Sequence, residues 1–103
     1  MLENEVILPT KITDLDVENV IASSSYYVFP DTTHTVCCIT LINGYTVIGE
    51  SACVNPSEFN KEMAEQISFQ QARKKIWMLE GYLLKEVTYG HSTYLSSKEE
   101  LKS

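Results

Sequence analysis

The strongest constraint on this chain is a tight reversal at Asn43-Gly44, between two segments that favour strands. Asn-Gly is the short-range pair most typical of β-hairpin turns, because both residue types readily adopt positive φ. Residues 34–42 before the pair and 45–54 after it contain many β-branched and apolar side chains, which strands prefer. The sequence therefore predicts an antiparallel hairpin near its centre.

The strand at 34–42 is predicted to be central and covered on both faces, because both of its alternating sets of side chains are fairly apolar. Tyr26 to Phe29, rich in aromatic and β-branched residues, predicts a further strand. Gly49 within the returning strand indicates either a bulge or a close approach of another backbone segment.

Helices are predicted on both sides of this hairpin. The run Asn55-Pro56-Ser57-Glu58 predicts the start of a long helix, with a capping residue, Pro at the first helical position and a carboxylate in the first turn. Apolar residues then recur at helical spacing, and Gly81 within this pattern indicates a kink or a close approach of another chain. Earlier, Thr13 and Asp16 have the spacing of a capping box and predict a short helix that ends near residues 23–25.

These elements predict one α+β domain over residues 1–103. Its small antiparallel sheet has about three strands around the central Asn-Gly hairpin, with one long C-terminal helix packed on it and a short N-terminal helix. The polar ends, residues 1–12 and 92–103, are expected to be poorly ordered. A domain of this size buries a modest core, which favours assembly into a homodimer or a higher homo-oligomer.

Charge and cysteine content exclude several classes of protein. The net charge of −6 argues against non-specific binding to DNA or to anionic membranes, which both need a positive surface. No segment predicts a membrane span, and the acidic start lacks a signal-peptide pattern, so a cytoplasmic protein is expected. The chain has an odd number of cysteines, which speaks against a disulfide framework; they are Cys37, Cys38 and Cys53. Adjacent cysteines point to opposite faces of a strand, so no metal site is predicted, and no cofactor.

No catalytic site is predicted either. Cys53 could act as a nucleophile with His34 or His91, and Glu50 with Glu80 could act as a carboxylate pair. No local pattern supports these arrangements, and the chain contains no phosphate-binding loop motif and no dinucleotide-binding glycine motif. We therefore predict that the protein is not an enzyme.

Two sequence features suit a phosphate-bearing ligand. At the junction that contains Ser51 and Asn55, a helix N-terminus would offer free backbone donors and a positive dipole end; the alternative is that Asn55 only caps the helix. Arg73 and Trp77 lie one helical turn apart and could contact the phosphate and the base of a nucleotide. The alternative there is a solvated basic turn beside a core Trp.

Four segments carry a family resemblance: His34–Cys37, Leu41–Val47, Gly49–Cys53 and Ala72–Leu84. In this order they resemble a family of small tailed-phage proteins long without an assigned role, which is identified as including the anti-Thoeris sponge proteins. Those sponges bind and sequester the cyclic ADP-ribose isomer made by TIR-domain defence proteins, without cleaving it, and some also hold cyclic oligonucleotides. The resemblance implies the same function for this chain, in the host cytoplasm.

The resemblance also implies a ligand pocket at a contact between subunits. Pockets of the family use an aromatic residue from the hairpin, a polar residue near the start of the long helix and an arginine on that helix. The matching positions are Tyr45, Asn55 and Arg73, with Lys74 as the neighbouring basic candidate, Ser51 at the adjoining corner and Tyr26 as an additional stacking residue. Two other functions stay open: a phage interaction module that inhibits a host protein through its acidic surface, and an enzyme that hydrolyses such a nucleotide.

Overall fold

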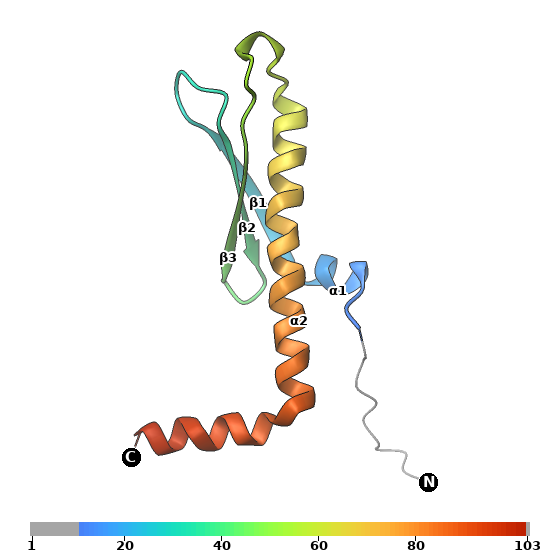
Figure 1. The fold of residues 1–103 in the computed structure, drawn as a ribbon, viewed down its shortest axis with the longest axis vertical. Coiled ribbons are helices and arrows are strands. Elements are labelled where there is room, and N and C mark those ends of the chain that lie inside the picture. Colours follow the sequence, from blue (N-terminus) through green and yellow to red (C-terminus); the bar gives the residue numbers. More distant parts are fainter. Residues whose placement is uncertain (1–10, 103) are drawn as a thin grey trace.

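The computed structural model describes the backbone of residues 11–102 and the side chains of residues 11–90. Its elements are α1 (Asp14–Asn19), β1 (Ile21–Val28), β2 (Thr35–Leu41), β3 (Thr46–Ser51), the 3-10 turn η1 (Pro56–Glu58) and α2 (Lys61–Lys102). The strands form one antiparallel sheet in the order β1-β2-β3, and α2 runs along one face of it (Figure 1). The predicted α+β class, with a short first helix and a long last one, is confirmed.

The central hairpin forms where Asn43-Gly44 predicts it. The amide of Gly44 donates to the carbonyl of Leu41 at 2.9 Å, and the amide of Leu41 donates to the carbonyl of Tyr45 at 2.8 Å. Gly44 has φ +90°, a left-handed conformation that glycine adopts without strain. The loop therefore contains three residues, Ile42 to Gly44, and the side chain of Asn43 accepts a further bond from the amide of Tyr45 at 3.0 Å.

Gly49 lies where β3 passes directly under α2. A Cβ atom at this position would overlap the carbonyl oxygen of Ser68 and the amide nitrogen of Ala72, and would lie 2.9 Å from the Cβ of Ala72. Ser68 and Ala72 are themselves small and fully buried. Of the two interpretations of Gly49, the close backbone approach is therefore confirmed. Beside it, the amide of Glu50 donates to Oε1 of Gln71 at 2.7 Å, which ties the outer edge of β3 to the helix.

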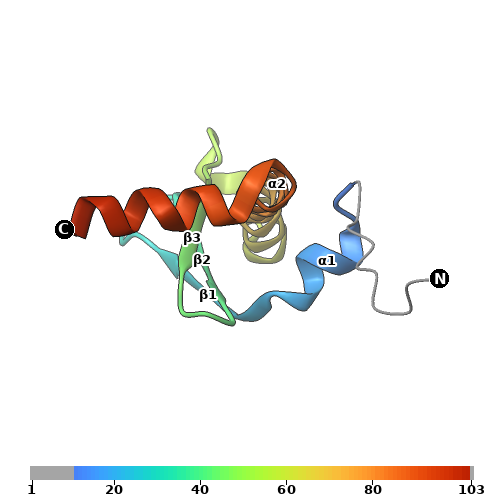
Figure 2. The ribbon, with the colours of Figure 1, turned by 90° about the horizontal axis from the view of Figure 1, so that it is seen from below.

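The core lies between the sheet and α2, and α1 contributes to it. Alternate residues of β2 face the helix and are buried. The buried apolar residues are Val17, Cys37, Ile39, Leu41, Val47, Ala72 and Ile76. Figure 2, in which the part of α2 before Gly90 is seen along its axis, shows α1 and this part of α2 on the same side of the sheet.

The prediction that β2 is covered on both faces is wrong. Val36, Cys38 and Thr40 point to the opposite face, and all three are only partly buried. The apolar character of this set favours a second covering layer. In the described residues the helices pack on one face only, so these side chains are shielded mainly by their neighbours within the sheet.

The N-terminal boundaries differ from the prediction in one respect. The capping box is present, since the amide of Asp16 donates to Oγ1 of Thr13 at 3.3 Å and the amide of Thr13 donates to Oδ2 of Asp16 at 2.8 Å. However, α1 ends at Asn19, and residues 23–25 belong to β1 rather than to a helix end. Pairing with β2 along the whole strand overrides the weak strand propensity of three consecutive serines.

The long helix begins five residues later than predicted. Asn55 caps only the 3-10 turn, by accepting a bond from the amide of Ser57 at 3.1 Å. Asn60 accepts from the amide of Met63 at 3.0 Å and caps α2. Local cap signals do not distinguish two Asn residues so close together, because each suits the role.

The same helix runs without interruption through Gly81. Its one non-helical residue is Gly90 (φ 155°, ψ 79°), where α2 changes direction (Figure 1), so the kink lies later than the sequence indicated. Helical backbone continues to Lys102. Residues 1–10 lie outside the described residues, and the poor order expected of both ends stays a prediction. Across residues 11–102, no helix combines the length and apolar character needed to cross a bilayer.

The contact at Gly49 predicts a strong effect of a single methyl group. Gly49→Ala should lower the free energy of unfolding by about 1–3 kcal/mol or more, because the overlap is with backbone atoms that cannot rotate away. The matched control is Gly81→Ala, where an added Cβ meets no atom within 4 Å and where alanine favours the helix by up to about 1 kcal/mol. Urea unfolding followed by circular dichroism measures both. Equal stability of the two variants would contradict the contact.

Candidate binding site

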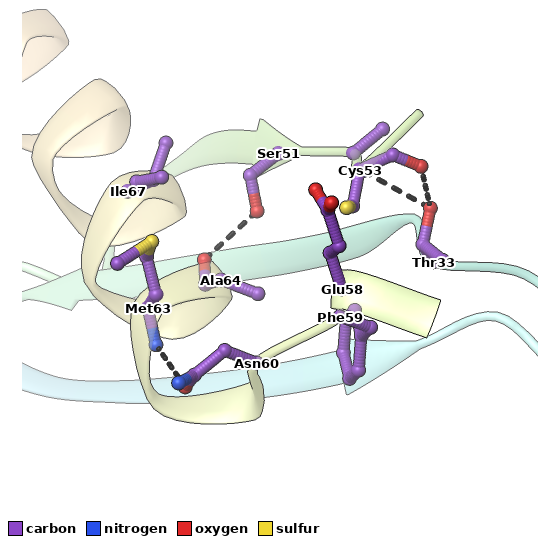
Figure 3. A pocket seen from close by; sticks show the side chains of 10 residues that line it. Thr33, Ser51, Cys53, Glu58, Phe59, Asn60, Met63, Ala64 and Ile67 are labelled. Carbon is purple, nitrogen blue, oxygen red and sulfur yellow. Dashed lines mark hydrogen bonds between the residues drawn. The ribbon is translucent and has the colours of Figure 1, made fainter. Parts of the chain in front are cut away.

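A hollow of about 180 Å³ opens where β3 leads into α2, at the end of the sheet opposite the hairpin. It lies between the end of β3, η1 and the first turns of α2 (Figure 3). Its walls are mostly apolar. The lining residues are Thr33, Ser51, Ala52, Cys53, Glu58, Phe59, Asn60, Met63, Ala64 and Ile67.

Hydrogen bonds between distant segments hold this hollow open. Oγ1 of Thr33 donates to the carbonyl of Cys53 at 2.6 Å and accepts from the amide of Cys53 at 3.0 Å, so the β1–β2 side of the molecule is fixed to the segment after β3 (Figure 3). Oγ of Ser51 donates to the carbonyl of Ala64 at 2.8 Å, which fixes β3 to α2. Both contacts are partly buried, and the walls are therefore set by the fold.

The size and charge of this hollow limit what it can bind by itself. Pockets for small ligands usually enclose about 300–1,000 Å³, so this one fits only part of a nucleotide-sized molecule. Among its lining residues Glu58 alone carries a charge, and a carboxylate disfavours a phosphate. The hollow suits an apolar or neutral group more than an anion.

The two polar residues predicted for this junction are already bonded within the chain. Ser51 lines the hollow, but its hydroxyl hydrogen goes to Ala64. Asn55 accepts from the amide of Ser57 at 3.1 Å and from Oγ of Ser57 at 2.9 Å. Asn55 therefore acts as a cap, which was the alternative to a ligand contact. The element that it caps is η1 and not the long helix.

The two predicted aromatic residues lie elsewhere. Tyr45 directly precedes β3 at the hairpin end and is exposed, about 20 Å from Ser51 if each strand residue advances by roughly 3.3 Å. Tyr26 lies on the edge strand β1, opposite Cys37, and points to the side of the sheet that carries α2. Burial raises the pKa of the Tyr26 phenol above its ordinary value, and the charge of Glu65 on α2 contributes to the shift.

Arg73 faces α1. Its Nη2 atom lies 3.3 Å from Oδ1 of Asp14 and 3.7 Å from Oε2 of Glu18, and 3.5 Å from the carbonyl oxygen of Asp14. The Arg73 side chain is 16% exposed, whereas the carboxylates are 81% and 52% exposed. Lys74 is exposed. It is two residues from each of the buried residues Ala72 and Ile76, so it lies on the opposite, outer side of the helix. Of the basic candidates, Arg73 is the one that the fold holds in place.

A single copy thus does not bring the predicted site residues together. Ser51 and Asn55 lie at one end of the sheet, Tyr45 at the other, Tyr26 on the edge strand and Arg73 on the flank of α2. Sequence reasoning missed Thr33 and Asn60. Asn60 has a readable signal, since it precedes the apolar helical pattern as a cap does. The Thr33 contact spans 20 residues and has no local signal.

The residues considered for catalysis are also engaged elsewhere. Nε2 of His34 contacts Oε1 of Glu50, and the thiol of Cys53 donates to the carbonyl of Asn55 at 3.1 Å. His91 lies outside the side chains that the structure describes. Within the described positions no three His, Cys, Asp or Glu side chains gather in a way that could hold a metal ion.

The double contact of Thr33 generates a test of how the hollow is built. Thr33→Val keeps the shape of the side chain and removes both bonds, leaving the partly buried amide and carbonyl of Cys53 without this partner. We expect a loss of about 1–3 kcal/mol in the free energy of unfolding. Thr46→Val, at an exposed strand position, is the matched control and should leave stability within about 0.5 kcal/mol. Thermal unfolding of the two variants decides the matter, and a Thr33→Val protein as stable as the control would refute it.

Comparison with known proteins gives one match. Residues 12–88 match the model of a family described as phage protein (N4 Gp49/phage Sf6 gene 66). No curated protein and no solved structure matches the chain. The matched segment runs from the residue before the capping box of α1 to the distal part of α2 and contains the whole sheet. The chain therefore belongs to the bacteriophage protein family of N4 Gp49 and phage Sf6 gene 66.

Proposed function

We propose that this phage protein binds a cyclic nucleotide defence signal in the host cytoplasm and holds it uncleaved. The ligand would be a cyclic ADP-ribose isomer, with cyclic oligonucleotides as further ligands. Membership in a phage family supports the setting, and the resemblance of four sequence segments to the sponge proteins supports the ligand class. The structural observation that carries the proposal is the partly buried guanidinium of Arg73, which is held against two exposed carboxylates.

Arg73 has the properties of a phosphate-binding residue. Its planar fork can donate two parallel bonds to phosphate oxygens. The N–O distances of 3.3 and 3.7 Å to its carboxylates and their exposure mark a weak ion pair, which the pyrophosphate of the ligand, with one charge on each phosphate, could replace. Trp77, one turn further along α2 and partly buried, lies on the same side of the helix and could stack on a base.

The proposal includes a pocket completed by a second copy of the chain. The distal part of α2 continues past the hairpin end of the sheet (Figure 1) with large apolar side chains exposed. They are Met78, Leu79, Tyr82, Leu83 and Tyr89. An exposed apolar stripe of this size on a helix is usually buried by a partner. The radius of gyration of 18.8 Å, against about 13 Å for a compact chain of this length, also supports assembly through α2.

A capture experiment tests the proposed function. The full-length protein is incubated with the cyclic ADP-ribose isomer and filtered, then heated, and the free nucleotide is measured before and after heating. We expect the nucleotide to disappear from the filtrate and to return intact after denaturation. A degraded nucleotide would mean an enzyme. A nucleotide that stays free throughout would leave the alternative, an interaction module that inhibits a host protein through its acidic surface.

The role of Arg73 can be separated from a merely structural one by two variants with opposite expected effects. Arg73→Ala should weaken capture about 10- to 100-fold. This range corresponds to the free energy of about 1.5–3 kcal/mol that a hydrogen bond to a charged group contributes. The double variant Asp14→Asn with Glu18→Gln should tighten capture several-fold, because it frees the guanidinium. It leaves the Thr13–Asp16 capping box intact.

The control for these variants is Lys61→Ala, which removes an exposed cation at the first residue of α2, about three turns from Arg73 and outside the distal part of the helix, and which should leave capture unchanged. Lys74→Ala tests the neighbouring basic candidate. Equilibrium titration with the isolated nucleotide measures all four proteins. If removal of the two carboxylates weakens capture as much as Arg73→Ala does, Arg73 serves to dock α1 and does not bind the phosphate.

A further inference from the structure

The free edge of β1 is the least protected surface of the fold. β1 is the outer strand of the sheet and pairs on its inner side with β2 from Ile21 to Val28. Its sequence, IASSSYYV, contains no charge and no proline, and its six central residues are exposed. The free amides and carbonyls of an edge strand pair readily with another strand. Edge strands are therefore normally blocked by charged residues or proline, by bulges, or by a covering segment.

The opposite edge of the sheet, formed by β3, is protected by α2, whereas the edge formed by β1 is not. On β3 the amide of Glu50 is bonded to Gln71, the hydroxyl of Ser51 is bonded to the backbone of α2, and α2 packs on the strand along its length. β1 contacts mainly β2. Its one irregularity, between Ile21 and Ser23, lies at the strand's first residues and leaves Ser23 to Val28 regular.

We propose that β1 pairs with β1 of a second copy, antiparallel about a two-fold axis, so that two sheets join into one of six strands. Charge favours this occupant. Two copies that each carry a net charge of −6 repel each other over most of their surfaces. The electrostatic repulsion is smallest where they meet through a strand that has no charged side chain. An antiparallel pair of identical strands is also self-complementary and closes at a dimer.

The pairing has a consequence for the surface that carries α2. Each α2 packs mainly on β2 and β3 and less on β1, so the joined sheet would have a trough above its two central strands. With strands about 4.8 Å apart, the two helices would lie about 20 Å apart, axis to axis. Tyr26 of each copy points to this side, near Glu65 on the flank of α2. Arg73 lies eight residues after Glu65, just over two turns further along α2 and rotated by about 80°.

This interface is distinct from the α2 contact of the proposed function and does not depend on it. Ser25 lies near the centre of β1 and is exposed. We expect Ser25→Lys and Ser25→Asp each to halve the particle mass seen by sedimentation velocity at a concentration where the wild type is assembled, because two like charges face each other across the axis. Mixing the two variants should restore the wild-type mass. Thr46→Lys, at an exposed position of β3, is the matched control and should change nothing.

Hydrogen exchange provides the second measurement. Among residues 23–27, the amides that point to the free edge of β1 should be protected in the assembled wild type and should exchange faster in Ser25→Lys, whereas those bonded to β2 and those of β3 should not change. Three results would overturn the proposal: a wild type that is monomeric at every concentration, a Ser25→Lys protein with wild-type mass, or a mixture that stays dissociated. Capture of the nucleotide is measured separately, so a protein that dimerises but binds no nucleotide would refute the proposed function and leave this interface standing.

Discussion

The close contact between Gly49 and the backbone of α2 determines the arrangement of this fold. Because β3 presents no side chain at this point, the helix backbone at Ser68 and Ala72 rests directly on the strand. That contact fixes the height of α2 above the sheet and its rotation about its own axis. The rotation in turn decides which residues of the helix are buried and which lie on its flanks. Arg73, the residue after Ala72, is turned toward α1 as a result.

Features that depend on a few neighbouring residues could be predicted from the sequence. The hairpin at Asn43-Gly44 and the capping box of α1 follow from the preferences of neighbouring residues. At Gly49 the close approach is one of two alternatives that the sequence indicates, the other being a bulge. The start of α2 could not be placed, because Asn55 and Asn60 are both suitable caps. The second face of β2 was misjudged because strand patterning reports average polarity and not the number of layers that cover a sheet.

The candidate site was less predictable than the fold for a physical reason. Ser51 lines a hollow at the junction that the sequence singled out, but the sequence could not indicate which polar atoms remain free. Those of Ser51 and Asn55 are used within the chain. Arg73 is bonded to a residue 59 positions earlier, a pairing that only the packing of α1 on α2 brings about. Long-range polar contacts decide the chemistry of a site, and local patterns do not encode them.

The ion pairs of Arg73 fit the proposed capture of an anion by an acidic protein. A guanidinium that is largely buried and unpaired would be costly, so a resting partner is needed, and exposed carboxylates at more than 3 Å provide one that can be displaced. Exchange of a carboxylate for a phosphate changes the electrostatic energy only modestly, because one anion replaces another. Tight capture must then arise from stacking and from enclosure. The hollows at the end of β3 in one copy, of about 180 and 410 Å³, are open to solvent, so the proposed enclosure is one that a second copy would complete. In this view assembly is a condition for binding, and the affinity for the nucleotide should fall when the copies separate.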